Sequence, residues 1–128
     1  MKSWSNYWKS SRNPGKQRKY RLNAPLHIKR KMCSSHISRE LKQKYSTRSM
    51  PVILGDKVKV VRGQFKNRTG KVEKIDLKKN RIIVSGIEIE KKDGSKTKYP
   101  INSSNLVITE LNLEDKKRNA ILERKKKK

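Results

Sequence analysis

The chain has 128 residues, and its 36 Lys and Arg against 11 Asp and Glu give a formal net charge of +25. Only 31% of the residues are hydrophobic, which excludes a large core and favours one small domain with extensions. A charge excess of this size predicts an anionic partner.

Several classes of protein are disfavoured by what the sequence lacks. No apolar run reaches the roughly 18 residues of a membrane span, and the first residues lack the apolar stretch of a secretory signal. Cys33, His27 and His36 do not form ligand pairs at zinc-like spacing. The acids fall among lysines, with no nucleophile, base and orienting group. We expect a soluble intracellular chain without enzymatic activity, metal, cofactor or small-molecule substrate.

The first 33 residues are basic and lack a periodic apolar face, so an extended arm is expected. The clusters GKQRKYR at 15–21 and HIKRK at 27–31 have the density of an RNA-binding arm, and a nuclear-localisation signal is a compatible reading. Trp4, Tyr7 and Trp8 either stack on unpaired bases or pack on other protein, and both alternatives remain open.

A short helix is predicted near residues 35–46. Ser34 or Ser35 can cap it, and apolar residues recur every four positions from Ile37 to Tyr45. The RSMP sequence then ends the helix, because proline disfavours the helical region for the residue before it.

From residue 52 the apolar period becomes two, with Val58 and Val60 alternating with lysines after a Gly55-Asp56 turn. Further strands are predicted at 71–76, 82–89, 96–101 and 106–110, separated by LKKN and KKDGSK turns. Five short strands with tight turns imply a small barrel.

Two further features complete this outline. Gly86 interrupts a strand and indicates a bend or bulge. After the barrel, Asn112 can cap a C-terminal helix that has acids in its first turn and lysines at its end.

The loop bounded by Gly63 and Gly70 is the best candidate for an anion contact. The two glycines permit a sharp turn or close backbone approach, and Lys66 and Arg68 lie between them. A plain hairpin with solvated charges is the alternative. Phe65 could stack on a base or belong to the core.

GDKVKVVRGQFKNRTGKVEKI, which contains this loop, resembles the KOW motif of SH3-like barrels in ribosomal and transcription-elongation proteins. The upstream NAPLHIKRKMCSSHISRELKQKYSTRSMP and the downstream SSNLVITELNLEDKKRNAILERK resemble the flanks of the large-subunit ribosomal KOW family, numbered twenty-four in bacteria and twenty-six in eukaryotes. Asn67 stands where that family often has glycine, and asparagine tolerates the same left-handed conformation.

The resemblance implies a structural constituent of the large ribosomal subunit. It implies binding to large-subunit rRNA, including the 5.8S region, contacts with neighbouring ribosomal proteins, a place near the nascent-chain tunnel exit, and assembly in the nucleus or nucleolus before work in the cytoplasm. The alternatives are a polymerase-binding KOW module of an elongation factor and a histone-like DNA-compacting protein.

The expected fold is mainly β: a small SH3-like KOW barrel at 51–111, a basic RNA-binding N-terminal extension at 1–50 with a short helix, and a C-terminal helix with a lysine tail at 112–128. The loop glycines Gly63 and Gly70 are expected to permit the sharp turn or close backbone approach of the KOW loop. The predicted RNA contacts are Lys16, Arg18, Lys19, Arg21, His27, Lys29, Arg30, Lys31, Arg39, Lys42, Arg48, Arg62, Lys66, Arg68 and Lys71.

Overall fold

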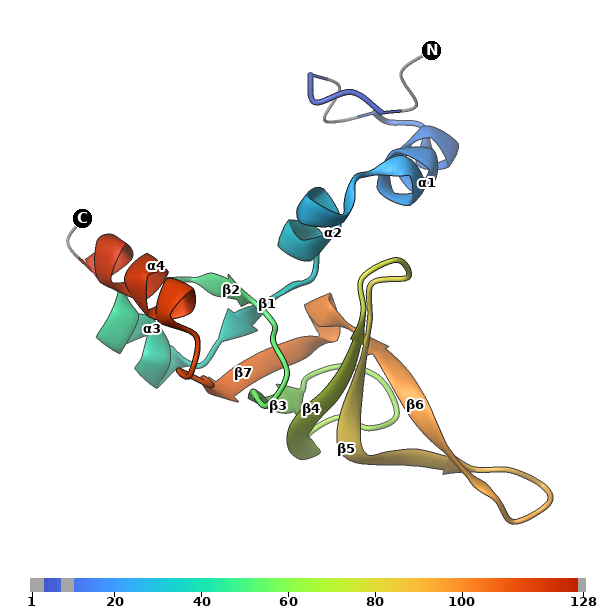
Figure 1. Cartoon of the computed structure of the whole chain (residues 1–128). Coiled ribbons are helices and arrows are strands. Elements are labelled where there is room, and N and C mark those ends of the chain that lie inside the picture. Colours follow the sequence, from blue (N-terminus) through green and yellow to red (C-terminus); the bar gives the residue numbers. More distant parts are fainter. Residues whose placement is uncertain (1–3, 8–10, 127–128) are drawn as a thin grey trace.

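The computed structural model describes residues 4–7 and 11–126 (Figure 1). No helix in these ranges is long and apolar enough to cross a membrane. In chain order, the helices and strands are α1 (Pro14–Asn23), α2 (Leu26–Met32), β1 (Ser34–Ile37), α3 (Arg39–Tyr45), β2 (Ser49–Pro51), β3 (Lys57–Val60), β4 (Thr69–Asp76), β5 (Arg81–Glu90), β6 (Lys96–Asn102), the 3-10 turn η1 (Ser103–Asn105), β7 (Leu106–Glu110) and α4 (Lys116–Lys126).

The strands form one strongly curved sheet in the order β2-β1-β7-β3-β4-β5-β6. All neighbours are antiparallel except β1 and β7, which run parallel. The predicted mainly-β small barrel with terminal helices is therefore confirmed. Gly86 has a φ of 75° and lies where the register between β5 and β6 shifts, as its place inside a strand predicted.

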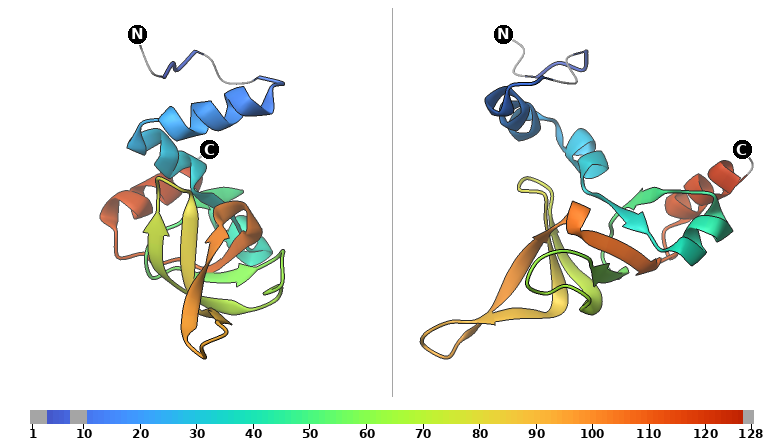
Figure 2. Two further views of the ribbon diagram at one scale, coloured as in Figure 1. Left: turned by 90° about the vertical axis from the view of Figure 1, so that its right-hand side faces the viewer. Right: turned by 180° about the vertical axis from the view of Figure 1, so that it is seen from behind.

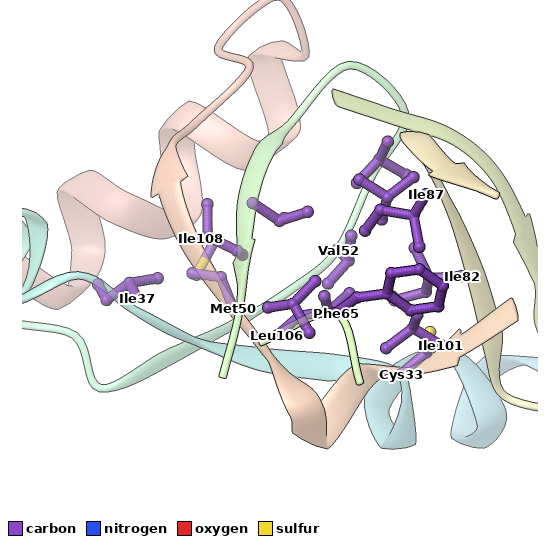
Figure 3. Close-up of a cluster of buried hydrophobic side chains, with 14 of the residues drawn as sticks. Cys33, Ile37, Met50, Val52, Phe65, Ile82, Ile87, Ile101, Leu106 and Ile108 are labelled. Atoms are coloured by element: carbon purple, nitrogen blue, oxygen red, sulfur yellow. The ribbon is translucent and has the colours of Figure 1, made fainter. Parts of the chain in front are cut away.

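The core fills the curve of the sheet (Figure 3). Val58, Ile82, Ile87, Leu106 and Ile108 are fully buried, and each comes from the inward-facing positions of a strand. Cys33 and Met50 join the same cluster, so the arm and the segment after α3 are fastened to the barrel by buried side chains. Burial also raises the pKa of the Cys33 thiol.

The expectation of an extended arm was wrong for residues 14–32, which form α1 and α2 (Figure 2). For α1 the reason is local capping. The Asn13 side-chain oxygen accepts from the Gly15 amide at 2.9 Å, and Pro14 occupies the first helical position. Neither helix buries a residue, so the absence of an apolar face in the sequence did not prevent helix formation.

The predicted helix caps also require correction. Ser34 and Ser35 lie in β1, and Ser38 caps α3 by accepting from the Leu41 amide. The short SSHI segment prefers to pair with β2 and β7, which lets it bury Ile37 in the core.

At the C-terminal side, Asn112 is not the cap of α4, which begins at Lys116. The Asp115 carboxylate accepts from the Lys117 amide at 2.9 Å. The Asn112 amide is instead held by the Asp56 carboxylate at 2.8 Å, in the linker between β7 and α4.

A buried ion pair fastens α4 to the barrel. Arg118 donates to the two carboxylate oxygens of Asp56 at 2.6 and 2.9 Å, with side-chain exposures of 4% and 0%. The same guanidinium donates to the Asn112 and Pro51 carbonyls, and the Ile53 amide also donates to Asp56. The pair thus joins the segment 51–56 before β3 to the segment 112–118, which is about sixty positions away in sequence.

Candidate nucleic-acid interface

The loop between β3 and β4 has a fixed backbone. The Asn67 amide donates to the Val60 carbonyl at 2.8 Å, and the Val60 amide donates to the Arg68 carbonyl at 2.9 Å. Gly63 and Asn67 have φ angles of 96° and 69°, so glycine and asparagine supply the left-handed residues that the turn requires.

Phe65 anchors the loop to the barrel. Only 9% of its surface is exposed, and it joins the core cluster while contacting the Tyr99 ring at 5.2 Å between centroids (Figure 3). Of the two alternatives for Phe65, the structure therefore supports the core residue. The Arg68 guanidinium lies over the Phe65 ring, 5.3 Å from its centroid. This contact holds the charge of the exposed Arg68 side chain at a defined place.

Gly70 serves close approach rather than backbone conformation. A Cβ atom at this position would lie 2.3 Å from the Ser85 carbonyl oxygen and 2.7 Å from Val84 Cγ1. The Lys71 amide donates to the Ser85 hydroxyl at 2.8 Å, so β4 and β5 are tightly joined directly after the loop.

The predicted contact residues are exposed, except Lys29, which is half-buried and donates to the Leu22 carbonyl at 2.8 Å. The ion pairs within the described ranges involve other residues: Lys57 with Glu110, Lys98 with Glu73, and Arg118 with Asp56. The predicted cations thus keep their charge available for an external anion.

The structure places these cations in three groups and not in one patch (Figure 1). The largest group lies on the arm, along α1 and α2. A second surrounds the β3–β4 loop, with Arg62, Lys66 and Arg68 in the loop and Lys71 in β4. The third, Arg39, Lys42 and Arg48, lies in and after α3, which packs beside α4 away from the arm.

The aromatic residues at the start of the chain have two different settings. The Trp4 ring packs against Tyr20 of α1 at 5.3 Å between centroids, so Trp4 contacts protein here. Tyr7 is 97% exposed. Trp8 lies outside the described residues.

One pair of cations next to the arm was missed by the sequence reasoning. Lys78 and Lys79 lie in the turn between β4 and β5, beside α1 and α2. The LKKN sequence predicted a turn, but only the fold shows that this turn faces the arm. Among the described residues, no group of His, Cys, Asp and Glu could hold a metal ion.

Residues 11–125 match the model of a family that comprises the eukaryotic ribosomal proteins L26 and the archaeal ribosomal proteins numbered twenty-four. The chain is also 49% identical over 115 residues to the large ribosomal subunit protein uL24 of Methanosphaera stadtmanae, an alignment that covers 90% of this chain and 98% of that protein.

Proposed function

We propose that this chain, which belongs to the family of the eukaryotic L26 ribosomal proteins and their archaeal counterparts, binds and stabilises rRNA as a structural constituent of the large ribosomal subunit. The membership supports a structural rather than a catalytic role. The rRNA contacts themselves are our inference from the geometry of the basic side chains.

The proposal depends mainly on the β3–β4 loop, which presents exposed cations from an ordered backbone. Lys66 and Arg68 are exposed, are free of acidic partners among the described residues, and project from a backbone that is fixed by hydrogen bonds and by the buried Phe65 ring. Because the loop backbone is already ordered, little backbone conformational entropy is lost when its cations meet phosphates. Phosphate contacts of this kind position a protein on RNA without reading a long base sequence.

The arm supplies the second contact. We propose that residues 1–50 form an RNA-binding extension of a barrel at 51–111, followed by the C-terminal segment 112–128. α1 buries no residue, and a ten-residue helix that adds no side chain to the core is marginal in water. RNA should therefore stabilise α1, and protection of its amides from hydrogen exchange should rise on binding.

Finer assignments follow from the family resemblance alone. They are contact with the 5.8S region, contacts with neighbouring large-subunit proteins, a position near the tunnel exit, and nuclear or nucleolar assembly where the cell has a nucleus. Cross-links between the chain and rRNA in intact large subunits would test the first three, and tagging the chain in its own cell would test the last.

The test of rRNA binding compares two double variants of equal charge. Lys66→Ala with Arg68→Ala should weaken binding to a large-subunit rRNA fragment and reduce the slope of log K against log salt by about one to two units. Thermal stability should change by less than about 0.5 kcal/mol, because both side chains lie on the surface. Lys116→Ala with Lys117→Ala, exposed in α4, is the matched control.

Sedimentation in high salt separates the proposal from its alternatives. The chain should stay with large subunits, whereas a polymerase-binding module or a DNA-compacting protein should not. A loop variant that binds rRNA and enters large subunits as well as the parent chain does would refute the assignment of the loop.

A further inference from the structure

A groove of 730 Å³ lies between the arm helices and one end of the barrel, apart from the β3–β4 loop. α1 and α2 form one wall, and the β4–β5 turn with η1 forms the other. Both views in Figure 2 show the β4–β5 turn reaching toward α2. The basic residues that line the groove are Arg18, Arg21, Lys29, Lys78 and Lys79, and no described Asp or Glu lines it.

Hydrogen bonds order each wall of the groove, and the Ser103 hydroxyl of η1 also lies 3.5 Å from the Met32 carbonyl at the end of α2. Ser103, 2% exposed, donates from its hydroxyl to the Asn80 side chain at 3.2 Å, and its carbonyl accepts from the Ser35 hydroxyl at 2.7 Å. The Lys29 bond to the Leu22 carbonyl links α2 to the end of α1. These contacts connect α2 to η1 and to the end of α1, so the two walls face one another across the groove.

The lysines of the β4–β5 turn are presented by a fixed backbone. The Asp76 side chain accepts from the amides of Lys78 and Lys79 at 2.9 and 3.1 Å, and Asn80 adopts a left-handed φ of 53°. Both lysine side chains remain exposed. Because the carboxylate holds the backbone, alanine at either lysine removes a charge and leaves the turn intact.

The groove also contains apolar surface. Leu22 of α1 is 72% exposed and lines it, together with the half-buried Met32 and Leu77. Cations combined with exposed apolar side chains suit a nucleic acid whose bases are unpaired, because a duplex keeps its base faces stacked inside the helix.

We propose that this groove binds a single strand of RNA, one or two nucleotides long, between the arm and the barrel. Its volume is that of a site for a small ligand, and this fits one or two nucleotides better than a duplex segment. Lys78 and Lys79 contact the phosphates from one side, Arg18 and Arg21 contact them from the other, and Leu22 packs against a base or ribose. The proposal rests on the rRNA-binding function and adds to it the single-stranded form of the ligand at this place.

A second lysine pair in the same chain provides the control. Lys91 and Lys92 lie in the exposed β5–β6 turn, outside the groove. Lys78→Ala with Lys79→Ala and Lys91→Ala with Lys92→Ala remove the same charge from the full chain. The probes are a uridine decamer, a blunt RNA duplex of similar length and the large-subunit rRNA fragment.

The groove variant should bind the decamer about tenfold more weakly than the parent, since two charge contacts are lost and each lies in the upper half of the range for exposed pairs. The affinity of the control variant for the decamer should fall by less than about threefold. The affinities of both variants for the duplex should fall by similar, small factors. Decamer carrying 4-thiouridine should cross-link to peptides of α1 and of the β4–β5 turn in the parent chain.

Equal losses for the two variants on the decamer, or cross-links that avoid both walls, would overturn the groove assignment and show general charge attraction only. The proposed function fails separately, when the loop variant and the groove variant both bind the rRNA fragment like the parent. Loss of rRNA binding in the loop variant alone would leave the function standing and reject the groove.

Discussion

Replacement of Arg118 by Met should destabilise the protein by about 3 to 5 kcal/mol, the usual cost of breaking a buried ion pair from one side. The guanidinium donates to both oxygens of Asp56 at 2.6 and 2.9 Å, and Asp56 is fully buried. After the substitution, the carboxylate keeps only its bonds from the Ile53 and Asn112 amides. Small domains have about 5 to 15 kcal/mol of stability, so the loss is a large fraction of the total.

Urea and thermal unfolding of the full chain, followed by circular dichroism, measure this loss. The control is Glu110→Gln, which removes the ion pair between Glu110 and Lys57. These side chains are 68% and 51% exposed, so the substitution should cost no more than about 1 kcal/mol of stability. Adding Asp56→Asn to Arg118→Met should cost less than the sum of the two single changes, because the two residues are directly coupled. A loss for Arg118→Met no larger than that of the control would refute the reasoning.

Three further predictions follow from packing and capping. Gly70→Ala should lower the melting temperature, because the new Cβ would lie 2.3 Å from the Ser85 carbonyl oxygen; an unchanged melting curve would contradict this contact. Asn13→Ala should speed amide exchange throughout α1, a cap costing about 1 kcal/mol, without moving the main unfolding transition, since α1 buries no residue. Burial raises the pKa of the Cys33 thiol, so its alkylation by iodoacetamide should be slower in the folded protein than in urea. The alkylation rate, followed by mass spectrometry, should also increase at a higher pH in the folded protein than in urea.

Local signals in the sequence were enough to predict the barrel. The alternation around Val58 and Val60, the turn residues and the glycine in β5 each act within a few positions, and the strands lie where these signals placed them. The left-handed Asn67 was likewise readable from its residue type.

What the sequence did not reveal depends on contacts between distant segments. SSHI looked like the start of a helix because a serine cap is a local signal, whereas its pairing with β7 joins residues about seventy positions apart. The neighbourhood of Lys78 and Lys79 is set in the same way, by α1 and α2 packing near the β4–β5 turn. The arm helices were missed for the opposite reason: neither needs an apolar face, and α1 forms with a local cap from Asn13 and helix-forming residues.

The bond between Asp56 and Arg118 also has a consequence for the order in which the protein matures. The two residues are 62 positions apart, and Arg118 lies in α4. During synthesis the Asp56 carboxylate therefore has no ion-pair partner until α4 has been made. Until then, the turn before β3 must either stay hydrated or carry an uncompensated charge, and either state weakens the packing of β3. Docking of α4 supplies the missing partner of Asp56 and so stabilises the barrel. Chains that lack this helix should therefore remain sensitive to proteases for longer than chains that contain it.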